Sequence, residues 1–178
     1  NTECKLHRGI LCEKTIFPDE NMLQYMNYKN YFSFSVLVFA TFCLSGQVVI
    51  NEFSASNYRQ FFDAFGGDED WIELYNPANV AVDISGYYLS DKLDNPTKWE
   101  VPAGTILPPN GYFQVWASSR DQFDGTRWHT NFKITQTQNN EAVVLANAAG
   151  NILDSHELDI PNQAGHSRGR FPDGGNEW

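Results

Sequence analysis

Cysteine is scarce in this sequence and absent from most of it. The chain of 178 residues contains 3 cysteines, and all of them, Cys4, Cys12 and Cys43, precede Gln47. A disulfide framework and a zinc site with cysteine ligands are therefore excluded after Gln47. Cys4 and Cys12 would pair only if the N-terminus were kept in an oxidising compartment. The fold of the larger part must depend on its apolar core.

Basic residues are also few. The chain has 12 Lys and Arg against 22 Asp and Glu, which gives a net charge of −10. Residues 47–178 carry the whole acidic excess. Affinity for DNA or RNA depends mostly on Lys and Arg that displace condensed counterions. We therefore expect no nucleic-acid partner unless a metal bridges the two.

Long apolar runs are limited to one segment near the N-terminus. Residues 26–46 have the layout of a secretory signal peptide, with a short start that contains Lys29, an uncharged run over 31–44, and the small pair Ser45 and Gly46. The rival interpretation is an uncleaved membrane anchor, because the uncharged stretch continues through 48–50. We expect cleavage near Gly46, because "VVINEF" fits a first strand better. The mature protein would then be secreted or at the cell surface, periplasmic or extracellular, with no membrane span.

The remaining boundaries follow from this placement. Met26 has the position of a start codon, so residues 1–25 are an upstream leader to which we assign no function. Residues 47–159 form the folded domain. Residues 160–178 are expected to begin a C-terminal extension that joins this domain to further domains of a larger protein.

The folded domain is predicted to be all-β. No segment keeps a period of 3.6, and short apolar or alternating runs recur between turn-forming clusters. "AVVLANAAGNILDS" reads as a hairpin closed at Gly150. Strands of this length and spacing are typical of an antiparallel sandwich. The expected strands are Val48–Phe53, Trp71–Tyr75, Val80–Ile84, Tyr87–Ser90, Trp99–Val101, Tyr112–Ala117, Phe132–Thr135, Ala142–Ala146 and Ile152–Ser155.

An ordered set of segments carries a family resemblance. "VVINEFSASN", "DWIELYNPANVAVDISGYYLSD", "WEVPAGTILPPNGYFQVWAS", "HTNFKI" and "NEAVVLANAAGNILDS" follow one another from Val48 to Ser155. Together they resemble the lamin tail domain in its bacterial secreted form. The resemblance implies an immunoglobulin-like β-sandwich without catalytic activity, used as an interaction module. The trailing "GHSRGRFPDGGNEW" is similar to a segment that often follows this domain in bacterial surface proteins.

The departures from nuclear lamins limit what the resemblance implies. The chain has no coiled-coil rod, no nuclear localisation run and no basic face. Filament assembly and chromatin binding are therefore not expected.

Four carboxylates crowd the segment "GDEDWIEL". Asp68 and Asp70 stand two residues apart at a strand entrance and would share a side, where a backbone carbonyl would complete a calcium site. The alternative is a solvated loop tip with Asp70 capping the strand. Glu73 and Glu52 either lie on a solvated face or are buried with a partner. We expect no resident cofactor, with calcium at Asp68 and Asp70 as the one candidate.

Catalytic motifs are missing from the folded domain. His129, His156 and His166 lack metal-binding spacing and are expected at the surface, and no G-x-S-x-G elbow occurs. Glu73 and Asp91 would serve a glycosidase only at a separation that the sequence does not fix. We therefore expect no enzymatic activity.

Two long connections are the expected binding loops, 54–69 and 118–130. Within the second, Trp128 is the candidate ligand-binding aromatic. A sugar-binding module would need Trp128 and a neighbouring aromatic ring to be exposed and coplanar. The sequence thus predicts a non-catalytic interaction or spacer module that binds a protein or a carbohydrate at the cell surface. The alternatives are a carbohydrate-binding sandwich and a calcium-assisted hydrolase or its accessory domain.

Overall fold

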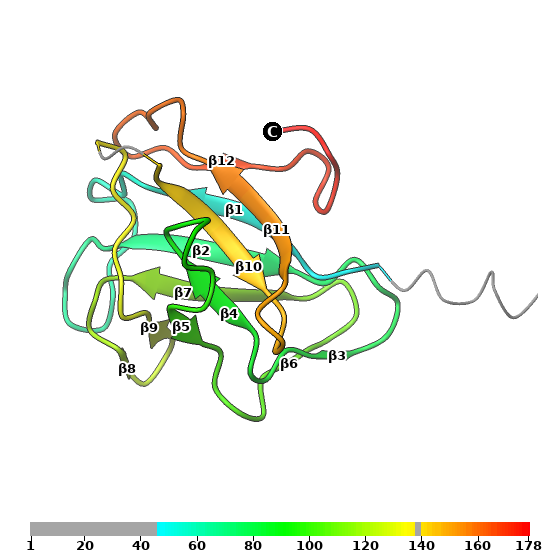
Figure 1. Ribbon diagram of the computed structural model, residues 1–178. Helices are drawn as coiled ribbons and strands as arrows, with labels where there is room; N and C mark the ends of the chain where they lie inside the picture. Colours follow the sequence, from blue (N-terminus) through cyan, green and yellow to red (C-terminus); the bar gives the residue numbers. More distant parts are fainter. Residues whose placement is uncertain (1–45, 138–139) are drawn as a thin grey trace, which may run out of the picture. The chain divides into compact units, whose positions relative to one another are not determined.

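The computed structural model describes residues 46–137 and 140–178 (Figure 1). In these residues the chain forms strands β1 to β12 and no helix, so no helix in this part is long and apolar enough to span a bilayer. The predicted leader, the three cysteines and all but the last residue of the predicted signal peptide lie outside the described residues.

A six-stranded sheet forms one layer, in the order β12-β1-β2-β7-β9-β8. Its neighbours are antiparallel except for β7 and β9, which run parallel. The strand bounds are β12 (Arg168–Gly169), β1 (Val49–Ser54), β2 (Asp70–Tyr75), β7 (Tyr112–Ala117), β9 (Trp128–His129) and β8 (Gln122–Phe123).

A four-stranded antiparallel sheet forms the second layer, in the order β11-β10-β4-β5. Figure 1 shows this sheet lying against β1, β2 and β7, and β1 contacts both β10 and β11. A separate pair, β3 and β6, closes one side. The all-β sandwich is therefore confirmed. The strand bounds are β11 (Ile152–Glu157), β10 (Ala142–Ala146), β4 (Tyr88–Ser90), β5 (Trp99–Glu100), β3 (Val82–Asp83) and β6 (Ile106–Leu107).

Period-two burial builds the core between the layers. Successive side chains of a strand point to opposite faces, and in β2 Ile72 and Leu74 are fully buried in the core with Val115 of β7. Burial of one such side chain contributes about 1.5–3 kcal/mol. The core forms without a disulfide among the described residues, as the composition requires.

The outer face of the six-stranded sheet is not solvated along its whole length. Trp71 pairs with Trp116 across β2 and β7, and the two side chains are only 4% and 1% exposed. Because these positions face away from the core, other segments must cover them. The covering segments are the two loops predicted to bind partners.

The predicted hairpin over 142–155 is confirmed, with β10 and β11 as its arms. Asn147 fixes the turn, since its Oδ1 accepts hydrogen bonds from the N–H groups of Ala149 and Asn151, both at 3.0 Å. Gly150 has φ +79°, a left-handed conformation that side-chain-bearing residues adopt at a cost.

Not every strand prediction is correct. The expected strand over 132–135 is wrong, because only Lys133 forms an isolated bridge, with Ser118. Phe132 and Ile134 are buried there, so the alternating pattern reflects burial without a ladder. The structure adds β6, β8, β9 and β12, of two residues each, which are too short to give a periodic signal.

Residues 160–178 fold onto the sandwich, with β12 lying beside β1. Arg170 donates from Nε to the carbonyl of Ile50 at 2.7 Å and from Nη2 to the carboxylate of Asp154 on β11 at 2.9 and 3.0 Å. Asp154 in turn accepts the Ile50 N–H at 2.8 Å. Arg170 therefore joins the edge of one sheet to the edge of the other.

Candidate functional site

The two predicted binding loops, 54–69 and 118–130, meet at one end of the six-stranded sheet. The first loop leads into β2 at Asp70, the second leaves β7 at Ala117, and these two residues are paired in the ladder. Both loops therefore emerge at the same end, on the left of Figure 1. We call the two segments together the paired loops. The sequence predicted each of them but not their convergence.

Asp63 anchors the first loop from inside. It is 6% exposed, and its Oδ1 accepts the N–H groups of Phe65 and Gly67 at 2.9 and 2.7 Å. Its Oδ2 forms an ion pair with Arg120 of the second loop. A buried carboxylate is stable only with such partners. One side chain therefore sets the shape of the first loop and fixes it to the second.

Asn57 holds the other half of the first loop. Its amide donates to the carbonyls of Phe61 and Glu69 at 2.9 and 2.7 Å and accepts the Phe61 N–H at 3.1 Å. Asn57 is buried, so these hydrogen bonds are shielded from water and are stronger than they would be at the surface. Despite its length, the loop has a defined backbone.

Four aromatic side chains project from this rigid loop into solvent. Tyr58, Phe61, Phe62 and Phe65 are each more than half exposed. Phe61 still meets Trp71 edge-on, with ring centroids 6.1 Å apart, and Phe65 lies 5.6 Å from the ring of His129. Phe61 and Phe65 thus cover part of the outer sheet face, while the exposed surfaces of all four rings remain available to a partner.

The acidic cluster is divided between several roles. Asp70 accepts the Asn57 N–H at 2.9 Å, and burial raises its pKa to about 6 against the lowering effect of that hydrogen bond. Asp68 is exposed and accepts the Arg59 N–H at 3.1 Å. Glu69 pairs with Arg120 and Lys133.

No group of three or more His, Cys, Asp or Glu side chains is arranged to hold a metal ion in the described part of the chain. Asp68 and Asp70, the calcium candidates, each support a backbone amide of the first loop instead. Calcium binding by this pair stays a prediction.

A serine, a histidine and an aspartate lie in series under the second loop. The Oγ of Ser118 lies 2.7 Å from Nδ1 of His129, and Nε2 of His129 lies 3.2 Å from Oδ2 of Asp124. Asp124 also accepts N–H groups from Thr126 and Arg127, both at 2.7 Å. Burial opposes the charge of Asp124, but these hydrogen bonds outweigh it and lower its pKa.

This series is built for support rather than for catalysis. Ser118 is 4% exposed and His129 is inaccessible to solvent, so no substrate reaches the hydroxyl. The imidazole is also reversed relative to a hydrolase triad, in which serine bonds Nε2 and aspartate bonds Nδ1. The expectation that His129 is a surface residue was wrong, because the paired loops cover it.

Trp128 and Phe123 of the second loop line a groove between this loop and β7. The groove has a volume of about 490 Å³, and Glu73, Tyr112, Gln114 and Arg127 also line it. Trp128 is half-buried, and its ring plane is tilted by 46° from that of Phe123. The coplanar pair required for a sugar platform is therefore absent at this position.

Glu73 faces the same groove and accepts a hydrogen bond from Nδ2 of Asn51 at Oε1, at 3.2 Å. Burial and the neighbouring carboxylates of Glu52 and Asp173 raise its pKa. Asp91 follows β4 in the other sheet and pairs with Lys98. Glu73 and Asp91 thus lie in different sheets, and of these two residues only Glu73 lines the groove.

The fold and these sites can be compared with known proteins. The model of the lamin tail domain matches residues 44–159, which is well over half of the chain. The chain belongs to the lamin tail domain family. This family has an immunoglobulin-like, non-enzymatic fold. A comparison of this chain with curated proteins gave no match.

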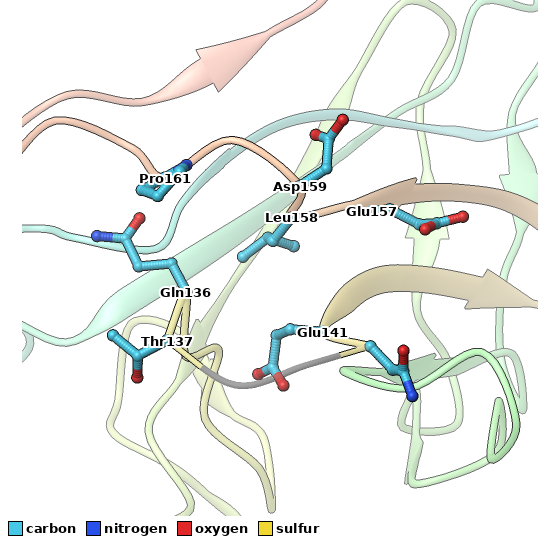
Figure 2. A pocket seen from close by; sticks show the side chains of 8 residues that line it. Gln136, Thr137, Glu141, Glu157, Leu158, Asp159 and Pro161 are labelled. Atoms are coloured by element: carbon cyan, nitrogen blue, oxygen red, sulfur yellow. The ribbon is translucent and has the colours of Figure 1, made fainter.

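A second hollow of the lamin tail domain, of about 350 Å³, is acidic (Figure 2). The carboxylates of Glu141, Glu157 and Asp159 point away from one another there. Glu141 is already engaged, by Lys92 at 2.6 Å and by the Thr135 N–H at 2.7 Å. The hollow therefore has no convergent group that would orient a ligand.

Sequence reasoning missed the residues that organise this lamin tail domain's paired loops. Asn57 and Arg120 stand in polar stretches, Asp63 stands among phenylalanines, and all three look like ordinary loop residues. One local signal was available, because Asp and Asn accept backbone N–H groups a few positions away and so stabilise turns. The long-range ion pair had no such signal.

Proposed function

We propose that this lamin tail domain is a non-catalytic docking module of a secreted or cell-surface bacterial protein, and that it binds a partner protein through the paired loops. The observation that carries the proposal is the exposure of Phe61, Phe62 and Phe65 on a loop whose backbone is fixed from inside. Aromatic residues dominate the binding energy of protein interfaces.

Rigidity supports a binding role for these side chains. A flexible loop would lose conformational entropy on binding, and a loop already held by Asp63 and Asn57 loses less. Exposed apolar side chains also have a solvation cost, and a cluster of them on a soluble domain is typical of an interaction surface. Export is supported by the signal-peptide pattern of residues 26–46.

The test is site-specific photo-crosslinking of the full chain in the bacterium that produces it. A benzoylphenylalanine replaces Phe62, which is 57% exposed, and a matched control carries it at Ile106, which is 61% exposed on β6. We expect an adduct with one cell-surface protein from position 62 and none from position 106. Serine at both Phe61 and Phe65 should remove the adduct.

Two outcomes would contradict the proposal. Equal yields from both positions would indicate random collision rather than docking. An adduct from position 62 that survives the loss of Phe61 and Phe65 would place the binding energy elsewhere.

A further inference from the structure

The groove between β7 and the second loop has a feature that the first loop lacks, an incompletely paired sheet edge. β7 pairs with β2 along all six residues, from Tyr112 to Ala117. On its other side, within the described residues, it pairs with β9 only at Val115 and Trp116. Tyr112 and Gln114 both line the groove. The strand therefore continues into the groove beyond its last β9 partner.

The direction of the β7 backbone groups follows from one hydrogen bond. The carbonyl of Trp116 accepts the Thr130 N–H at 2.8 Å, so the backbone groups of Trp116 point away from β2. Backbone groups alternate along a strand, and those of Gln114 and Tyr112 share this direction. These residues accordingly turn main-chain groups toward the groove.

The facing wall of the groove is preformed. Asp124 accepts the N–H groups of Thr126 and Arg127 and so fixes the turn between β8 and β9. This turn presents Phe123 and Trp128, whose ring centroids lie 5.1 Å apart. An apolar side chain of a ligand would pack against these two rings.

Arg127 supplies a charged group at the same wall. Its guanidinium lies 5.8 Å from the ring centroid of Trp116 and forms no ion pair with any other described residue. Arg127 is exposed and lines the groove. In a domain with a large acidic excess, such an unpaired cation selects for a carboxylate on the ligand.

We propose that this groove binds an extended segment of a partner protein, which adds a short strand at Tyr112–Gln114, packs an apolar side chain on Phe123 and Trp128, and pairs a carboxylate with Arg127. Main-chain hydrogen bonds to an open edge give such complexes their affinity, and neighbouring side chains give them specificity. One wall of the groove belongs to the second of the paired loops, but the site does not include Phe61, Phe62 or Phe65, so it extends the proposed docking role without depending on it.

The observations favour a peptide over a glycan. A glycan needs flat aromatic surfaces and side-chain hydrogen bonds, and the two rings are tilted by 46°. An extended peptide needs the open main-chain edge that β7 has. The volume of about 490 Å³ lies in the range of ordinary ligand sites, roughly 300–1,000 Å³.

The test begins with a phage-displayed library of random dodecapeptides selected on the full chain, with a glycan array probed in parallel. The best peptide is synthesised and titrated against variants. Gln114→Pro deletes the N–H that faces the groove and leaves the β2 ladder unchanged, whereas Gln114→Thr keeps that N–H. We expect Gln114→Pro to weaken binding about tenfold or more and Gln114→Thr less than about threefold.

Further variants test the individual residues of the groove and distinguish this proposal from the proposed docking at the first loop. Phe123→Ser and Arg127→Gln should each weaken the peptide about fivefold or more. Phe61→Ser with Phe62→Ser should leave the peptide affinity unchanged, so a failure of docking at the phenylalanines of the first loop and a failure of the groove are distinguishable. Thermal unfolding of each variant confirms that it is folded.

Three results would overturn the proposal. The first is that no peptide is enriched. The second is that the peptide tolerates Gln114→Pro in a folded variant. The third is that a glycan binds and is lost with Phe123→Ser but not with Gln114→Pro, which would assign the groove to sugars.

Discussion

Asp63 and Arg120 form an ion pair between loops that are 57 residues apart in sequence, and the Asp63 side chain is completely buried while Arg120 is one-third exposed. Asp63→Ala would leave two backbone N–H groups without their acceptor and would remove one of the two carboxylates that pair with Arg120. We expect the free energy of unfolding in urea to fall by about 2–4 kcal/mol. Asp68→Ala, at an exposed neighbour, should cost less than about 1 kcal/mol. Equal losses would contradict the anchoring role of Asp63.

Asp70 should make stability depend on pH in an unusual direction. Its pKa is raised to about 6, so between about pH 4 and 6 the folded state holds a proton that the unfolded state has released, and stability falls as pH rises through this window. Asp70→Asn keeps an acceptor for the Asn57 N–H and removes the charge. We expect the variant to gain on the order of 1–2 kcal/mol at about pH 7.5 and almost nothing at about pH 4. A gain that is equal at both pH values would contradict this account.

Calcium binding by Asp68 and Asp70 has a direct test. If the pair holds the ion, millimolar calcium should raise the unfolding temperature of the wild type, because a ligand that binds only the folded state stabilises it. The increase should vanish in Asp70→Asn, and magnesium serves as the control. An unchanged unfolding temperature would contradict calcium binding by Asp68 and Asp70.

His156 on β11, whose ring centroid lies 4.1 Å from that of Trp178, should lower the stability of the fold in acid. Burial and the charge of Arg168 lower its pKa, Arg170 adds to this effect, and Asp159 and Asp154 oppose it. The unfolded state therefore takes up the proton first, and stability is lost as pH falls below about 6.5. His156→Gln should reduce the loss between about pH 7.5 and 5.5, measured by urea unfolding. An identical loss in the variant would exclude His156 as the source.

The series Ser118, His129 and Asp124 should behave as a support and not as a nucleophile. His129→Ala should lower the free energy of unfolding by about 2–4 kcal/mol, because it leaves a cavity in place of a fully buried ring and removes one hydrogen-bond partner each from Ser118 and Asp124. A fluorophosphonate probe should leave Ser118 unlabelled, as judged by mass spectrometry. Stoichiometric labelling at Ser118 that His129→Gln abolishes would establish a reactive serine and contradict this assignment.

Local patterns predicted the parts of the fold that depend on one strand at a time. The alternation of Ile72 and Leu74 with Trp71 and Glu73 was visible in the sequence, and so was the turn at Gly150. The positions of both binding loops were also visible, because turn-forming polar residues mark them.

Long-range contacts account for what the sequence did not reveal. His129 is polar and stands in a loop-like segment between Trp128 and Thr130, and only the covering loop buries it. The parallel pairing of β7 with β9 has two positions, too few for a periodic signal. The tilt between Phe123 and Trp128 depends on a hairpin turn and not on residue type.

The contact of Arg170 with both sheets bears on how this domain should be cut from its protein. The family match ends at residue 159, yet β12 lies nine positions further on and occupies the free side of β1. A recombinant fragment that stops at the family boundary would bare the main chain of β1 and leave Asp154 without its cation. Unpaired edge strands of two molecules can form main-chain hydrogen bonds with each other. Such a fragment would therefore self-associate, while one that extends through Trp178 would stay monomeric.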